Sequence, residues 1–184
     1  GYVGRGKSKS KDAISGKDLK KFGFKNRSTP DKGNQIFIQN IYSSESGIIG
    51  SFAGELEAKE TVTVITDSDI MTCKYLVGVL HSRLINFYLF RFCFNGSKLT
   101  AHTDSKYLSS IPIIVPANSE FNRVINLVEK LEVTEYLSDL WHKSYEQLNS
   151  LIYEIYGIND KEKILIENSI QNIQSSRWKY NELR

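Results

Sequence analysis

The sequence predicts an α+β fold, in which a twisted mixed β-sheet packs on a central helix and is followed by C-terminal helices. Residues 61–66 (TVTVIT) are β-branched throughout, which is typical of a strand, and apolar residues also mark strands at 35–43 and 48–53. From residue 70 onward, apolar residues recur at spacings of three and four, which is the period of an amphipathic helix. The strands therefore precede the helices, an order that favours the α+β class.

The first strand, residues 35–43, is expected to be buried on both faces. Ile36 and Ile38 lie on one face of a regular strand, and Phe37 and Ile41 lie on the other. A strand with apolar side chains on both faces is typical of a sheet that is covered on both sides.

Turn and proline signals delimit the rest of the sheet. Residues 43–47 (SSESG) predict a turn that leads into the returning strand at 48–53. The apolar segment 111–115, with Pro112 and Pro116 at its ends, predicts a short buried strand. Because proline has no N–H to donate, we expect this strand at a sheet edge or in a short pairing.

The central helix is expected over residues 70–92. Asp67, Ser68 and Asp69 supply oxygen acceptors that cap its first N–H groups, and Asn95-Gly96 ends the helical run. Its apolar stripe contains Leu76, Val79, Leu80, Leu84, Phe87 and Tyr88. Off this stripe lie Lys74, His81 and Arg83.

Three more helices are expected after Pro116. The first has an apolar face of Phe121, Val124, Ile125, Val128 and Leu131. The second, at about 137–156 and closed by Gly157, has Leu148, Leu151, Ile152 and Ile155. The third is capped by Asp160, with Ile164, Leu165, Asn168 and Ile173 directed inward. Trp178 and Tyr180 are expected in a polar C-terminal tail.

Composition indicates a soluble cytoplasmic protein. The chain has 184 residues, 40% hydrophobic and 24% charged, enough to bury a substantial core. It has no run of 18 apolar residues and no secretory signal pattern, so no membrane span is expected. The two cysteines, Cys73 and Cys93, lie in apolar surroundings and are expected to be reduced thiols. The single methionine is Met71 and the chain begins at Gly1, so we expect a piece of a longer protein.

Positive charge is concentrated at the N-terminus. Residues 1–32 contain ten Lys or Arg and three Asp, a net charge of +7, so the rest of the chain sums to −4 of the total +3. Such a basic segment favours a polyanionic partner. A solvated basic tail without a partner is the alternative.

The residues YLVGVLHSRLINFYLFRF (75–92), then YLSSIPIIVP (107–116), then a long amphipathic helix carry a family resemblance. This order of motifs resembles the TaqI-like C-terminal specificity domain of adenine-specific DNA methyltransferases, which occurs in type IIG restriction–modification enzymes. It is also similar to the target-recognition domains of type I specificity subunits. The resemblance covers most of residues 17–160; His81 stands where the family usually has Asn, and Ile114 where a proline is common.

The resemblance implies sequence-specific recognition of double-stranded DNA, with methyl transfer performed by a separate catalytic domain of the parent protein. Residues 1–116 would then form the recognition core with its basic N-terminal arm, and residues 117–184 a helical region packing on it. The phosphate contacts are expected from Arg5, Lys7, Lys9, Lys11, Lys20, Lys21 and Arg27. The groove contacts are expected from Gln39, Asn40, Tyr42, Ser44, Lys59, Lys98 and His102.

Amide side chains support two interpretations of the first strand. Gln and Asn can pair with the edge of adenine in the major groove, which would place Gln39 and Asn40 at a groove-facing strand end. Alternatively, both amides are hydrogen-bonded inside the core, as buried polar groups usually are.

The chain lacks the catalytic motifs of an adenine methyltransferase, so no catalytic or metal-binding residue is expected. Such an enzyme needs a glycine-rich cofactor turn and an Asn/Asp-Pro-Pro-aromatic motif. The prolines occur only at 30, 112 and 116, and none follows Asn or Asp. S-adenosylmethionine is therefore expected in the catalytic domain of the parent.

Two other functions remain open. Pro30-Asp31 with Glu57-Ala58-Lys59 has the PD…ExK form of Mg²⁺-dependent nucleases, although so short a pattern arises readily by chance. The helices of residues 117–174 carry an excess of negative charge and are unsuited to DNA. They could instead dock another protein of a restriction–modification complex.

Overall fold

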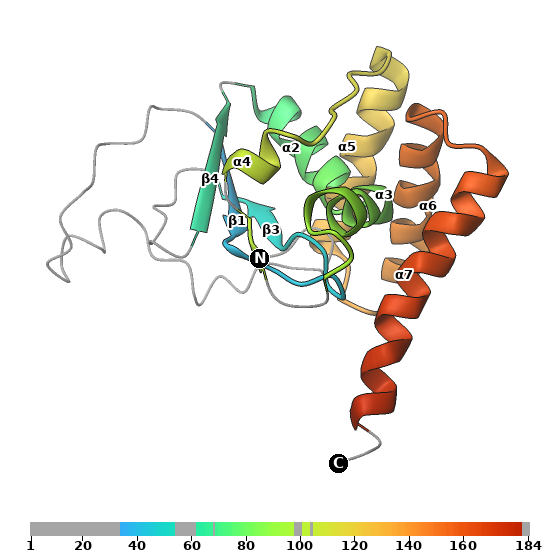
Figure 1. Cartoon of the computed structure of the whole chain (residues 1–184). Coiled ribbons are helices and arrows are strands. Elements are labelled where there is room, and N and C mark those ends of the chain that lie inside the picture. Colours follow the sequence, from blue (N-terminus) through green and yellow to red (C-terminus); the bar gives the residue numbers. More distant parts are fainter. Residues whose placement is uncertain (1–33, 54–61, 68, 98–100, 104, 182–184) are drawn as a thin grey trace, which may run out of the picture.

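The computed structural model describes residues 34–53, 62–67, 69–97, 101–103 and 105–181 (Figure 1). The strands are β1 (Asn34–Gln39), β2 (Ile41–Tyr42), β3 (Gly50–Phe52), β4 (Val62–Asp67) and β5 (Ala101–His102). The central helices are α2 (Ile70–Leu80), α3 (Arg83–Tyr88) and the π-helical turn η3 (Leu89–Cys93). The remaining helices are α4 (Ser105–Leu108), α5 (Asn118–Val133), α6 (Asp139–Ile155) and α7 (Asp160–Asn181). The α+β class is confirmed.

The sheet has the strand order β3-β1-β4, and a separate two-stranded ribbon joins β2 to β5. All pairings of the described strands are antiparallel, so the expectation of a mixed sheet is corrected. The physical reason is connectivity: only ten residues separate β1 from β3, and parallel neighbours need a crossover connection of a dozen or more residues.

The first strand is completely buried on one face and only partly covered on the other, where Gln35 is buried, which corrects the expectation that both faces are buried. Ile36 and Ile38 are completely buried, because α2 packs against their side of the sheet. Phe37 is half-buried, and the strand bends at Asn40, after which Ile41 is 48% exposed. Ile41 lies on the same face of the chain as Phe37, so its exposure follows the alternation of the strand.

The segment 111–115 does not form the expected strand. Ile111 is buried, but the next four residues are exposed and pair with no described strand. Tyrosine hydroxyls hold the segment instead: Tyr75 donates to the carbonyl of Ile114 at 2.5 Å, and Tyr156 donates to the carbonyl of Pro112 at 2.8 Å. Burial raises the pKa of Tyr75 to about 12. The two prolines remove N–H groups that a ladder would need, while leaving the carbonyls free to accept.

The central helix is broken, which corrects the expectation of one continuous helix over 70–92. Asp69 caps α2 as predicted, accepting from the N–H groups of Met71 and Thr72. The chain turns at His81-Ser82, and the Ser82 hydroxyl accepts from the N–H of Ile85 to cap α3. The run ends at Asn95-Gly96 with positive φ at both residues, as the sequence predicts.

Helix α2 is buried over most of its circumference and has no single apolar stripe. It packs between the sheet and α5, so side chains on opposite sides of the helix are both covered (Figure 1). Its buried residues are Cys73, Tyr75, Val77, Gly78, Val79 and Leu80. Leu76, expected on the stripe, is half-buried, whereas His81, expected off it, is buried.

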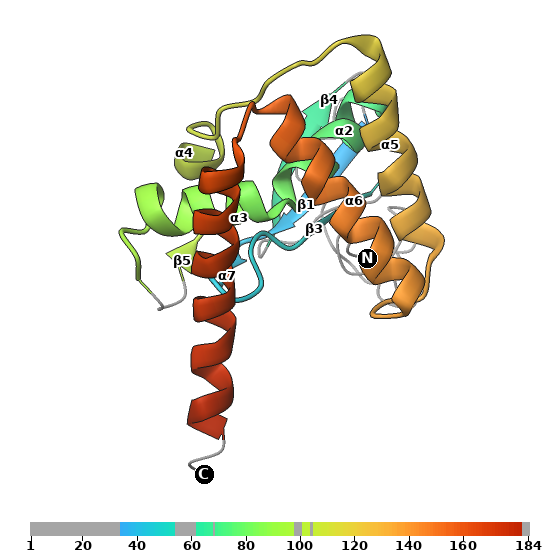
Figure 2. The ribbon, with the colours of Figure 1, turned by 90° about the vertical axis from the view of Figure 1, so that its right-hand side faces the viewer.

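Helices α5 and α6 lie side by side, with α5 covering α2 and α6 packing on α3. Figure 2 shows α7 crossing α3 and continuing beyond the body. The predicted α5 face is confirmed, since Val124, Ile125, Val128 and Leu131 are all buried. Gly157 follows α6 with a φ of 65°, as predicted for a helix end.

The third C-terminal helix needs two corrections. Asn159, not Asp160, caps it, because the Asn159 side chain accepts from the N–H groups of Lys161 and Glu162. Glu162 reaches back to the N–H of Asn159, which completes a capping box. Ile164 and Leu165 are 61% and 59% exposed, and Asn168 is also exposed. The inward face consists of Ile166, Ser169, Ile170 and, as predicted, Ile173.

Helix α7 also takes the place of the polar tail that was expected at the C-terminus. It extends through Asn181 and includes Trp178 and Tyr180. One hydrophobic core joins the sheet, α2, α3 and the three C-terminal helices. The helical region therefore packs on the strand-bearing part of the chain, while the division at residue 116 stays a prediction.

Within the described ranges, no helix has the length and apolarity that a membrane span needs.

Close packing at Gly78 gives a testable consequence. A Cβ at this position would lie 2.8 Å from Val124 Cγ1 and 2.9 Å from Val128 Cγ2, both on α5. We expect Gly78→Ala to lower the free energy of unfolding by about 1–2 kcal/mol in urea titrations, although alanine favours helix. The cost should shrink in a Val124→Ala background and persist in an Ile170→Ala background; equal costs in both would contradict the proposed overpacking.

Candidate nucleic-acid interface

Polar groups from three segments of the chain meet at the end of β1. Gln39 pairs with Val62 at the start of β4, and the Thr63 hydroxyl donates to Asn40 Oδ1 at 2.5 Å. Thr103, which follows β5, donates its N–H to the Asn40 carbonyl at 2.8 Å and its hydroxyl to the Gln39 carbonyl at 2.5 Å. Threonine hydroxyls therefore tie the ends of β1, β4 and β5 together.

This sheet end contains three of the predicted groove residues. Gln39 and Asn40 are half-buried, and His102 is exposed on β5, directly opposite the exposed Ile41 on β2. The hydrogen bond to Thr63 bears out an internal role for the Asn40 carbonyl oxygen. The predictions that these residues contact bases stay predictions.

Tyr42 and Ser44 are buried and do not face an open surface, which corrects their assignment to the groove. The Tyr42 hydroxyl donates to Asn86 Oδ1 at 2.7 Å, and Asn86 Nδ2 donates to the Ser44 carbonyl at 2.9 Å. Burial, and then the neighbouring Cys93, raise the pKa of Tyr42 well above its ordinary value. Tyr42 shares the face of the buried Ile36 and Ile38, so regular strand alternation already turns it inward.

The other candidate residues lie outside the described ranges, and their roles stay predictions. The phosphate-contact candidates among them are Arg5, Lys7, Lys9, Lys11, Lys20, Lys21 and Arg27. The groove candidates among them are Lys59 and Lys98. The residues of the nuclease-like pattern among them are Pro30, Asp31, Glu57, Ala58 and Lys59.

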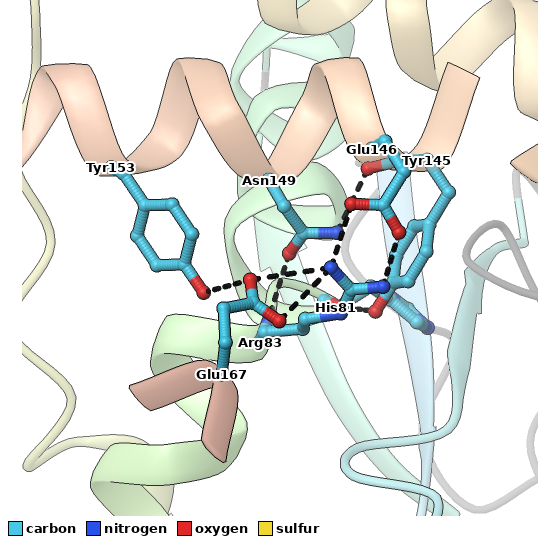
Figure 3. Close-up of polar contacts among 7 residues, drawn as sticks. All are labelled: His81, Arg83, Tyr145, Glu146, Asn149, Tyr153 and Glu167. Atoms are coloured by element: carbon cyan, nitrogen blue, oxygen red, sulfur yellow. Dashed lines mark hydrogen bonds and ion pairs between the residues drawn. The ribbon is translucent and has the colours of Figure 1, made fainter. Parts of the chain in front are cut away.

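A second polar cluster, which the sequence analysis missed, centres on Arg83 (Figure 3). Both terminal nitrogens of its guanidinium donate to the carboxylate of Glu146 on α6, and the Nη1–Oε2 distance is 2.7 Å. Nη1 also lies 3.2 Å from a carboxylate oxygen of Glu167 on α7. Tyr153 donates to Glu167 at 2.9 Å, and the Arg83 N–H donates to Asn149 Oδ1 at 2.7 Å. Three helices thus meet at one cation.

The backbone turn before Arg83 is also held by side chains. Gly50 of the sheet donates its N–H to His81 Nε2 at 3.1 Å, so His81 Nδ1 carries the proton that it shares with the Val77 carbonyl at 2.8 Å. Tyr145 of α6 donates to the His81 carbonyl at 2.9 Å. Asn149, a polar residue inside the apolar face of α6, is the sequence signal that could have indicated such contacts.

The Arg83 cluster has the chemistry of a structural clamp. Burial lowers the pKa of Arg83, but the hydrogen bond to Glu146 and the charge of Glu167 outweigh this effect and raise it above the ordinary value. The carboxylates that could act as bases are thus already engaged by the guanidinium. Across the described part of the chain, no group of three or more His, Cys, Asp or Glu side chains has the arrangement of a metal site.

No protein-family model and no curated protein matches the sequence. Among solved structures, the chain is similar to the Type IIL restriction-modification enzyme MmeI, whose structure was solved in complex with DNA. The match has a TM-score of 0.56 and 13% sequence identity, and it covers 80% of this chain and 22% of that chain. At this identity the similarity shows a shared fold, and the chain corresponds to about a fifth of the enzyme's length.

The clamp predicts unequal effects of two arginine substitutions. Arg83→Met removes the charge that Glu146 and Glu167 face. We expect it to lower the free energy of unfolding by about 2 kcal/mol, a loss between those typical of surface ion pairs and of buried ion pairs. Arg123→Met removes an exposed arginine 3.9 Å from Glu154, and its effect should stay within about 0.5 kcal/mol. Urea titration of both variants measures the difference, and similar losses would show that the clamp contributes little.

The buried Tyr42 predicts a stability loss at alkaline pH. Above its ordinary pKa of 10.0, the unfolded chain loses the hydroxyl proton while the folded chain keeps it, so unfolding is favoured as pH rises. The free energy of unfolding therefore falls with pH in this range. We expect Tyr42→Phe to make this fall between pH 10 and 12 less steep, by as much as about 1.4 kcal/mol per pH unit. At pH 7 the variant should be less stable by about 1 kcal/mol, because Asn86 loses its donor. Denaturation of Tyr136→Phe, at an exposed tyrosine, is the control; identical slopes would contradict the prediction.

Proposed function

We propose that this chain is the sequence-recognition part of a DNA restriction–modification enzyme or of an adenine-specific DNA methyltransferase. The observation that carries the proposal is the fold match of 80% of the chain to MmeI, a restriction–modification enzyme solved in complex with DNA. The order of motifs in residues 75–116, which resembles the TaqI-like specificity domain, supports it independently. So does the +7 net charge of residues 1–32, since DNA affinity depends strongly on phosphate neutralisation.

In this proposal the chain binds DNA and another part of the parent protein performs the chemistry. The match covers 22% of the MmeI chain, which leaves most of such an enzyme outside the compared region. The sequence contains no Asn/Asp-Pro-Pro-aromatic motif. S-adenosylmethionine and the flipped adenine would therefore bind the catalytic domain, which is the expected protein partner.

The proposed contacts divide into two groups. The N-terminal Lys and Arg residues neutralise phosphates. We propose base-edge contacts for Gln39, Asn40 and His102, which lie at one sheet end. Lys59 and Lys98 join the second group because each precedes a strand of that end by three residues in the sequence. Tyr42 and Ser44 are no longer included, because both are buried.

A salt titration of DNA binding tests the proposal. Each Lys or Arg that meets a phosphate contributes about 0.9 to the slope of log affinity against log salt concentration. We expect the Lys7→Ala/Lys9→Ala/Lys11→Ala variant to lose up to about three units of slope on duplex DNA, measured by fluorescence anisotropy.

The matched control is Lys130→Ala/Lys143→Ala/Lys161→Ala, which removes the same charge from exposed positions of the C-terminal helices. Its slope should remain close to that of the unsubstituted chain. An unchanged slope in the N-terminal variant would show that this segment is a solvated tail, and absence of DNA binding by the unsubstituted chain would refute the proposed function.

A further inference from the structure

Phe92 is an exposed aromatic side chain, with 71% of its surface open. It lies in η3, whose other aromatic residue, Phe90, is buried against α7. The π-helical geometry places an extra residue in the turn, and such turns are rare and frequently occur at functional sites. Burying Phe92 would be favourable, so its exposure calls for a physical explanation.

The exposed ring is held in place rather than left mobile. Phe87 meets it edge-on at a centroid distance of 6.3 Å, and Tyr88 lies tilted against it at 5.6 Å. Tyr88 is itself fixed, because its hydroxyl donates to the Ser110 carbonyl at 2.9 Å. A ring supported on two sides loses little conformational entropy when a partner covers it.

Contacts through Phe94 bring η3 next to the candidate interface. Phe94 stacks on Tyr42 of the β2–β5 ribbon at 4.6 Å and packs against Tyr107 of α4 at 4.8 Å. Figure 2 shows η3, α4 and β5 along one edge of the molecule. The turn that carries Phe92 is therefore a neighbour of the β2–β5 ribbon, which contains the exposed His102.

This edge of the molecule also carries positively charged side chains. Arg91 of η3 and Lys106 of α4 are exposed, and no ion pair engages either of them within the described ranges. In the sequence, residues 91–112 contain three Lys or Arg and one Asp, a net charge of +2, whereas residues 117–174 contain five Lys or Arg and ten Asp or Glu, a net charge of −5. A polyanion would therefore approach this edge and avoid the C-terminal helices.

We propose that Arg91, Phe92 and Lys106 form an aromatic–basic rim that contacts duplex DNA, with Phe92 acting as an apolar wedge against a base step. Arg91 and Lys106 neutralise phosphates on either side of it. Duplex DNA is the partner that offers both closely spaced anions and apolar base faces, and proteins commonly insert phenylalanine at partly unstacked steps. The inference rests on the proposed function and adds residues to its DNA-contact surface.

The decisive comparison is between two exposed apolar side chains. In anisotropy titrations of the full chain with a labelled duplex, Phe92→Ala should weaken binding about tenfold and leave the salt slope unchanged, because no charge is lost. Leu165→Ala, on the exposed face of α7, should bind as the unsubstituted chain does. Phe92→Trp should retain affinity, because a larger ring preserves the stacking surface.

A charge comparison tests the rest of the rim. Arg91→Gln/Lys106→Gln should lower the salt slope by about two units, and Lys143→Gln/Lys161→Gln should leave it unchanged. If the unsubstituted chain binds DNA but Phe92→Ala behaves like Leu165→Ala, the rim proposal is overturned and the proposed function stands. If the unsubstituted chain binds no DNA, the proposed function itself fails.

Discussion

The turn at His81-Ser82 determines how the helical part of the molecule meets the sheet. A continuous helix would use the backbone groups of this region internally, whereas the turn leaves the His81 carbonyl open to the Tyr145 hydroxyl of α6. The His81 ring accepts an N–H from Gly50 of the sheet, so one residue connects both layers. Arg83 then joins α3 to α6 and α7 through two carboxylates. Removing the half-buried charge of Arg83 is costly chiefly through Glu167, which is itself half-buried, whereas Glu146 is exposed and can be solvated.

This junction also sets the position of the surface proposed to meet DNA. Helix α3 continues directly into η3, so an anchored α3 fixes where Phe92 and Arg91 project. Phe94, which follows η3, packs against aromatic side chains of the β2–β5 ribbon and of α4, so the anchored α3 also fixes the position of η3 relative to these elements. The acidic helices α5–α7 cover the other side of α2 and α3. The fold thereby separates a cationic edge from an anionic helical layer, an arrangement that orients a polyanion before any specific contact forms.

Sequence reasoning located the candidate interface only in part. It selected Gln39, Asn40 and His102, which the structure brings to one sheet end, because amides and imidazoles near turns are chemically suited to base edges. It also selected Tyr42 and Ser44 for their polar groups, although both are buried and Tyr42 shares the face of the buried Ile36 and Ile38. Because side chains along a strand alternate with a period of two, strand periodicity by itself assigns Tyr42 to the core face. The Arg83 clamp was missed because its members lie up to 84 residues apart.

The sequence by itself determined the α+β class and the local backbone features. β-branched runs, the Asp69 cap and the left-handed residues Gly96 and Gly157 depend on interactions within a few residues, so the local sequence contains the information. The tertiary structure decided which side chains are buried and which extended segments pair. Helix α7 offers Ile164 and Leu165 as readily as Ile166 and Ile170, and only packing on α3 selects the second pair. Burial depends on surfaces supplied by distant parts of the chain, and no local pattern specifies those surfaces.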